Sequence, residues 1–189
     1  MSFQTEIPVI RDILAEGGII LYPTDTIWGI GCDPFNPTAI EKVYALKQRS
    51  ESKSLILLVD AITMLREYVT DMPPKLITLH EYHIRPLTIV YLRTKNLPNY
   101  LLAEDQSVAI RIPKDTFCKT LIAAIGHPIV STSANISGQP SPMSFESIDP
   151  TIKKGVDYVV QYRQNDTHFE PPSVIATLNH ENEIIILRP

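Results

Sequence analysis

The sequence has few cysteines, no long apolar run and no amino-terminal targeting signal. Only two cysteines occur in 189 residues, and Cys32 and Cys118 stand far apart with no spacing typical of metal ligands. No apolar run is long enough to span a bilayer, and Met1–Glu6 lacks the basic patch and apolar core of a signal peptide. These absences predict a reduced, cytoplasmic protein that does not cross a membrane.

Two glycine-rich nucleotide-binding motifs and the usual catalytic arrangements are also missing. The chain contains neither a G-x-x-x-x-G-K-[ST] loop nor a G-x-G-x-x-G turn. No Ser-His-Asp or Cys-His arrangement can be argued. The five histidines, at positions 80, 83, 127, 168 and 180, show no H-x-x-x-H or related spacing. We therefore predict structural or surface roles for the histidines and no metal held by the protein.

Composition and length favour one globular unit. Hydrophobic residues make up 44% of the chain, which is enough for a substantial core, and charged residues make up 20%. A net charge of −4 argues against a protein coated for nucleic acid, but it is compatible with a local basic groove. We predict a single domain over residues 1–189.

The order of the predicted elements indicates an α/β or α+β fold with a mixed sheet. Helices are expected at about 7–16, 36–47, 60–68, 74–82 and 115–125, with a helical turn at 145–148. Strands are expected at 19–22, 54–59, 87–92, 107–112, 128–130, 158–160, 173–178 and 183–188. The strand at 19–22 does not alternate, so it should be buried on both faces. Strands and helices alternate early and strands dominate the end, which is typical of a mixed sheet.

A hydroxyl-rich stretch follows the strand at 128–130. Residues 131–138 combine four hydroxyl groups, one amide and a glycine, which suits an oxygen-rich ligand at the end of a sheet. The alternative is a turn that only caps the next segment. Gly29 and Gly31, after a second hydroxyl-rich turn at 23–26, indicate close approach of the backbone to another segment or a ligand.

Three cations have informative positions. Lys47 continues the apolar stripe of its helix, so its stem should be buried and its ammonium should emerge at the helix C-terminus, with Arg49 just beyond. The alternative is a solubilising surface pair. Arg111 lies inside an apolar strand and must pair or face a cavity, unless it is an edge residue facing water.

These polar groups occur at five separate ends of strands or helices, and such ends can line one crevice. The five groups are Thr24 with Thr26, Lys47 with Arg49, Arg111 alone, Ser131 with Ser133 and Asn135, and Ser173 with Arg188. Several cations beside hydroxyl donors suit a phosphate ester held next to a carboxylate.

Five motifs in order resemble the YrdC-like threonylcarbamoyl-AMP synthases. They are Pro-Thr-Asp-Thr at 23–26, Trp-Gly-Ile-Gly-Cys at 28–32, Lys-x-Arg at 47–49, Ala-Ile-Arg-Ile-Pro at 109–113 and Ser-x-Asn-x-Ser-Gly at 133–138. The resemblance implies a YrdC/RibB-like fold, with a twisted mixed sheet flanked by helices and a deep, positively charged cavity. It implies the short, single-domain form. It also implies synthesis of threonylcarbamoyl-AMP and pyrophosphate from L-threonine, bicarbonate and ATP, with Mg²⁺ carried on the ATP phosphates.

The resemblance also implies roles for ten residues. Lys47 and Arg49 would be the catalytic cations. The nucleotide would be bound by Lys47, Arg49, Ser133, Asn135, Ser141 and Arg188, and threonine by Thr26, Arg111, Ser131 and Ser173. The product would pass to a tRNA threonylcarbamoyl transferase that modifies adenosine.

Two other functions use the same cations. A non-catalytic protein could bind double-stranded RNA phosphates through a basic concave face, or a divergent paralogue could bind nucleotide alone. A dihydroxybutanone-phosphate synthase shares the fold but needs a carboxylate set for Mg²⁺, which this sequence does not supply.

Overall fold

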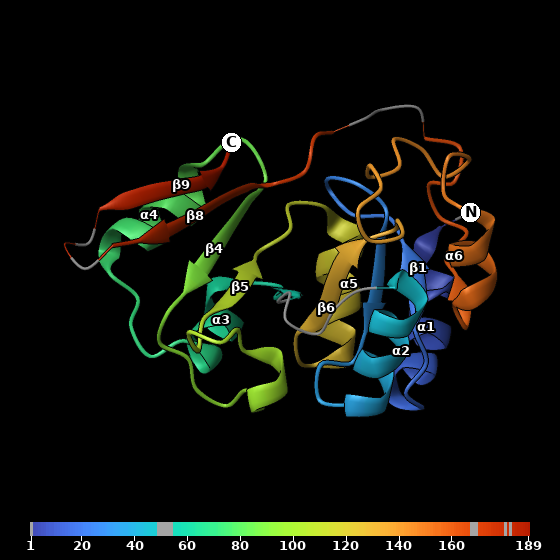
Figure 1. The fold of residues 1–189 in the computed structure, drawn as a ribbon, viewed down its shortest axis with the longest axis horizontal. Coiled ribbons are helices and arrows are strands. Elements are labelled where there is room, and N and C mark those ends of the chain that lie inside the picture. The colour runs from blue at the N-terminus through green and yellow to red at the C-terminus, as the bar shows by residue number, and fades with distance from the viewer. Residues whose placement is uncertain (1, 49–54, 167–169, 180, 182) are drawn as a thin grey trace.

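The computed structural model describes residues 2–48, 55–166, 170–179, 181 and 183–189. Nine strands among these residues form one mixed sheet in the order β7-β1-β2-β6-β3-β5-β4-β8-β9 (Figure 1). The strands are β1 (Ile20–Tyr22), β2 (Gly29–Cys32), β3 (Ile56–Leu58), β4 (Leu87–Tyr91), β5 (Val108–Arg111), β6 (Ile129–Ser133), β7 (Tyr158–Val159), β8 (Val174–Leu178) and β9 (Ile184–Arg188). The predicted mixed α/β architecture is confirmed.

Helices cover both faces of this sheet. They are α1 (Ile7–Ala15), α2 (Pro37–Lys47), α3 (Ile62–Tyr68), α4 (Pro74–Tyr82), α5 (Thr116–Ile125) and α6 (Pro150–Gly155), with 3₁₀ turns at Phe3–Thr5 and Asn99–Leu101. Side chains of α1 and α5 form one apolar core with one face of the sheet, and side chains of α2, α3 and α4 belong to a second core. Within the described part of the chain, no helix has the length and apolarity needed to cross a membrane.

Strand β1 contributes to both cores, as its unbroken apolar sequence predicted. Ile20 and Tyr22 pack with α1 and α5, whereas Leu21 packs in the other core. Tyr22 also explains a glycine in β2, because a Cβ on Gly31 would lie 2.7 Å from Cε1 of the tyrosine ring. The predicted close approach at this glycine is therefore confirmed, and the neighbour is a buried ring.

Several elements differ from the prediction. Helix α3 begins at Ile62, two residues after the expected start, and neither α6 nor strand β2 was predicted. The signals for α6 are local: Pro150 occupies its first turn, and Asp149 accepts a hydrogen bond from the Thr151 N–H at 2.7 Å. Strand β6 continues through Ser133, because β2 pairs with it up to that residue, whereas β3 pairs with it up to Ser131. The first three hydroxyl groups of the stretch at 131–138 are therefore on a strand and not in a turn.

Candidate functional site

A cavity of about 280 Å³ lies against the sheet and is lined by residues of seven strands and their connections. Its floor is a row of side chains in register across neighbouring strands: Ser131 on β6, Ile56 on β3, Ala109 on β5 and Val90 on β4. The row combines small polar and apolar side chains, so the floor leaves space for a ligand above the sheet. About half of the residues that line the cavity are polar, and their hydroxyl and guanidinium groups converge on it, as expected of a pocket for a polar ligand.

The structure brings most of the predicted site residues to this cavity. Seven of the ten line it: Thr26, Arg111, Ser131, Ser133, Ser141, Ser173 and Arg188. Lys47 and Asn135 are not lining residues, but both contact the end of β6 that forms the wall. Arg49 lies outside the described residues.

Arg111 is buried and paired, so the alternative of an edge residue facing water is wrong. Its side chain is 5% exposed, Nη1 donates to Thr26 Oγ1 at 2.9 Å, and Nη2 lies 3.5 Å from Asp25 Oδ1. The Nε–H is buried and has no hydrogen-bond partner in the part of the chain that the structure describes. The guanidinium lines the cavity and can bind a carboxylate of a ligand with donors that Thr26 and Asp25 do not use.

The turn that carries Thr26 is held by its own hydroxyl groups. Thr24 Oγ1 accepts the Thr26 N–H at 3.1 Å and donates to Ile27 O at 2.8 Å. From the other side, Arg163 donates from Nη1 to Thr24 O at 3.1 Å. These bonds fix the Thr26 hydroxyl where it meets Arg111.

A second guanidinium enters the cavity from the end of β9. Arg188 donates from Nη2 to Ser173 O at 2.7 Å, and Ser173 Oγ lies 2.7 Å from Thr88 Oγ1. Burial lowers the pKa of Arg188, and the positive charge of Arg111 lowers this pKa further. Two guanidinium groups that repel each other across one cavity favour an anionic ligand between them.

Lys47 does not direct its ammonium to solvent, so the alternative of a solubilising surface residue is wrong for this lysine. The residue is 1% exposed, and its Nζ donates to Ser133 O and, at 2.7 Å, to Asn135 O. The Ser137 N–H donates in turn to Lys47 O at 2.8 Å. The end of α2 therefore fixes the turn after β6, and the predicted burial of the lysine stem is confirmed.

Asn135 is held in this turn by main-chain oxygens. Its Nδ2 donates to Ile136 O at 2.9 Å and to Gln139 O at 2.7 Å. Its Oδ1 is buried with no hydrogen-bond partner among the described residues. A buried acceptor without a partner is costly, and this one lies in the turn that directly follows the cavity wall.

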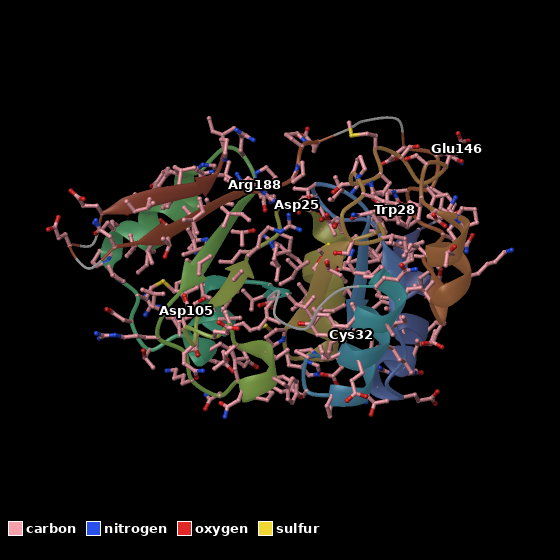
Figure 2. All side chains as sticks on the ribbon, viewed as in Figure 1. Asp25, Trp28, Cys32, Asp105, Glu146 and Arg188 are labelled. Atoms are coloured by element: carbon pink, nitrogen blue, oxygen red, sulfur yellow. The ribbon has the colours of Figure 1, made fainter. Side chains whose placement is uncertain are left out.

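Asp25 is a site residue that the sequence reasoning did not single out. Its side chain is 7% exposed, Oδ2 accepts the Lys114 N–H at 2.8 Å, and Oδ1 lies beside the Arg111 guanidinium. Figure 2 shows Asp25 and Arg188 near each other at the same end of the sheet, with Cys32 at the opposite end of β2. The signal was present, because a buried arginine requires a counter-charge and Asp25 is the acid in the neighbouring turn.

Replacing Asp25 by asparagine is expected to lower the free energy of unfolding by about 1–2 kcal/mol, because Arg111 loses its carboxylate partner in a buried setting. The matched control is Asp12→Asn, whose carboxylate pairs with Arg11 at 2.8 Å with both side chains more than half exposed. That change should cost less than about 1 kcal/mol. Urea denaturation of both variants measures the difference. Equal losses would mean that the Asp25 pair contributes no more than a surface pair.

Trp28 forms an aromatic wall of the cavity, although the sequence identified it only as part of the motif at 28–32. It is 7% exposed, lines the cavity, and packs on Phe145 with ring centroids 4.9 Å apart. Lys153 of α6 places its Nζ over the same ring, 4.6 Å from the Phe145 ring centroid. The loop after β6 is thereby anchored over the cavity.

No metal-binding cluster is found in the described part of the chain, where no three histidine, cysteine, aspartate or glutamate side chains gather suitably. The charged residues among those that line the cavity are both arginines. The cavity can therefore hold an anion through guanidinium and hydroxyl donors without a carboxylate cage.

Comparison with known proteins identifies relatives over most of the chain. The model of the Sua5–YciO–YrdC family, described as "Telomere recombination", matches residues 12–189. A threonylcarbamoyl-AMP synthase of Pseudoalteromonas translucida (strain TAC 125) is 36% identical over 163 residues, covering 85% of this chain and 87% of that protein. One from Vibrio parahaemolyticus serotype O3:K6 (strain RIMD 2210633) is 34% identical, covering 76% of this chain and 79% of that protein.

Solved structures share the fold. P. abyssi Sua5 complexed with L-threonine superposes with a TM-score of 0.88 at 25% identity, and the match covers 98% of this chain and 54% of that one. The chain thus spans about half the length of P. abyssi Sua5. E. coli YciO superposes with a TM-score of 0.85 at 23% identity, covering 98% of this chain and 89% of that one. The fold, the ordered motifs and these similarities together show that the chain belongs to the Sua5–YciO–YrdC family.

Proposed function

We propose that this protein is an L-threonylcarbamoyladenylate synthase, a nucleotidyltransferase that uses L-threonine, bicarbonate and ATP. The observation that carries the proposal is the cavity in which Arg111 and Arg188 meet a set of hydroxyl groups from four segments of the chain. Two relatives named threonylcarbamoyl-AMP synthase, 36% and 34% identical to this chain, support the same activity.

Threonine is assigned to the part of the cavity around Arg111. The guanidinium would bind the substrate carboxylate with the donors that Thr26 and Asp25 leave available. Ser131 and Ser173, both buried, would bind the hydroxyl and amino groups of threonine. P. abyssi Sua5 was crystallised in complex with L-threonine, which supports an amino-acid site in this fold.

ATP is assigned to the remainder of the cavity, with Ser133 beside the turn after β6 and Arg188 beside Ser173. Ser133, Ser141 and Arg188 would contact the phosphates and ribose, and Asn135 would offer its unpaired Oδ1 to a donor of the nucleotide. Lys47, which does not line the cavity, would act by fixing the main chain of the turn after β6 and by adding positive charge near the phosphates. We assign Arg49 to the phosphates from its position in the motif alone.

The reaction requires an anion to approach a polyanion. The threonine amine and bicarbonate give a carbamate and water, and a carbamate oxygen then attacks the α-phosphate, with pyrophosphate leaving. Fixed guanidinium and ammonium groups offset the developing charge and hold the two substrates in line, so no protein nucleophile is needed. Mg²⁺ would be carried on the ATP phosphates. The product would be used by a tRNA threonylcarbamoyl transferase in the cytoplasm.

The test is the formation of pyrophosphate by the purified full chain. Pyrophosphate release should require threonine, bicarbonate and ATP together, and mass spectrometry should detect threonylcarbamoyl-AMP. Calorimetric titration should show that threonine with bicarbonate tightens ATP binding. Release of pyrophosphate from ATP without threonine, or ATP binding indifferent to threonine, would contradict the synthase and favour a nucleotide-binding paralogue.

A further inference from the structure

The outer strand of the sheet carries an unusual concentration of exposed apolar side chains. Ile184, Ile185, Ile186 and Leu187 follow one another on β9 and are 41%, 41%, 53% and 55% exposed. β9 is the last strand in the sheet order, so one of its backbone edges has no strand partner among the described residues (Figure 1). A long apolar edge strand offers unpaired N–H and C=O groups to another chain.

Two further apolar side chains extend this surface. Tyr82, at the end of α4, is 76% exposed, and Ile84, in the connection to β4, is 91% exposed. Both line a hollow of about 810 Å³ together with Ile184. We call the six side chains at 82, 84 and 184–187 the β9 edge surface. It contains six of the eleven exposed large apolar side chains in the described part of the chain, far above the scatter expected on a monomer.

The other edge of the sheet does not resemble it. The last strand there is β7, which has two residues, and Tyr158 and Val159 are both partly buried. Short and covered edges are how a sheet normally avoids pairing with another chain. The contrast between the two edges indicates that a protein partner covers β9.

Charge determines which partner fits the β9 edge surface. Glu183 lies at the start of β9 and Arg188 at its end. Arg85 lies near the same end as Arg188, because Pro86 O accepts the N–H of Val174, at the start of β8, at 2.9 Å. One end of β9 is therefore acidic and the other basic. Antiparallel pairing with a second copy brings each acidic end to a basic end, twice.

We propose that β9 pairs antiparallel with β9 of a second copy of this chain, so that two sheets join across a twofold axis. The pairing completes the backbone hydrogen bonds of both edges and packs the apolar side chains of β9 against their counterparts across the axis. Because β9 also carries Arg188 into the cavity, the contact holds in place a strand that contributes to the proposed site.

The test is the mass of the full chain in solution, measured by light scattering and sedimentation at micromolar concentration. A single species of twice 21.3 kDa is expected. The double variant Ile184→Lys with Ile186→Lys should have the mass of one chain, because its dissociation constant should rise at least about thirtyfold. The matched control is Val9→Lys on α1, which is 46% exposed and distant in the fold, and it should stay paired. Circular dichroism checks that all three remain folded.

A charge exchange tests the antiparallel orientation. Glu183→Lys and Arg85→Glu should each weaken the pair several-fold, and the chain with both changes should regain it, because the exchanged charges meet between copies. A wild-type protein with the mass of one chain would overturn the proposal, as would a polydisperse series of larger species. If the variant Ile184→Lys with Ile186→Lys still has the mass of two chains, the contact does not involve β9 and the proposal is overturned. None of these outcomes depends on the synthase activity.

Discussion

Removing the Arg111 guanidinium is expected to lower kcat/KM for threonine by about 10²- to 10³-fold, while the Kd for ATP changes little. The reason is that this side chain is the charged donor with a fixed position at the proposed amino-acid end of the cavity. The change is made as Arg111→Gln with Asp25→Asn, so that no unpaired carboxylate remains buried. Steady-state kinetics with threonine varied at saturating ATP measures the loss.

Two comparisons separate binding from folding in this experiment. The single variant Asp25→Asn keeps the guanidinium and should retain far more activity than the double variant. Arg11→Gln is the matched control, because the Arg11 side chain is 52% exposed and pairs only on the surface. An unchanged threonine saturation curve in a folded double variant would show that Arg111 does not bind the substrate.

Replacing Lys47 by methionine is expected to lower the free energy of unfolding by about 2–4 kcal/mol, because Ser133 O and Asn135 O both lose a charged donor in a buried position. Pyrophosphate formation should also fall by roughly 10²-fold or more, since the turn that carries Asn135 loses its anchor and the site loses a positive charge. Urea denaturation gives the first quantity and the activity assay gives the second.

Lys42→Met is the matched control on the same helix. Lys42 Nζ also donates to a carbonyl, Gly17 O at 3.0 Å, but its side chain is 46% exposed. Its replacement should cost less than about 1 kcal/mol and leave activity intact. If Lys47→Met is as stable as Lys42→Met yet inactive, the lysine acts only on the substrate. If it is unstable yet active per folded molecule, the role is structural.

The fold brings two arginines to this cavity, and their neighbours neutralise the two charges to different extents. Arg111 is balanced by Asp25, whereas Arg188 is held by the carbonyl of Ser173. One cation is therefore partly neutralised and the other keeps its full charge. A carboxylate beside the first and a phosphate beside the second would match this difference, because the more highly charged ligand meets the less neutralised cation.

The sequence alone predicted eight of the nine strands, all except β2, and the chemistry available to the sheet. Unbroken apolar runs such as Ile19–Tyr22 identified strands buried on both faces, and β1 has that burial. An arginine inside an apolar strand had to be paired or face a cavity, and Arg111 does both. These inferences depend on local spacing and on the cost of burying a charge, which are properties of the residues themselves.

Only the tertiary structure decided where each charge lies and which groups meet. Lys47 contacts Ser133 and Asn135, and Arg111 contacts Thr26, across 85 to 88 residues of chain. Helical spacing correctly predicted that the stem of Lys47 is buried, but the acceptors of its ammonium belong to another part of the chain. The extension of β6 to Ser133 likewise depends on pairing with a distant strand, β2. Such contacts are fixed by how strands pair and helices pack, because a hydrogen bond between distant segments leaves no local pattern in the sequence.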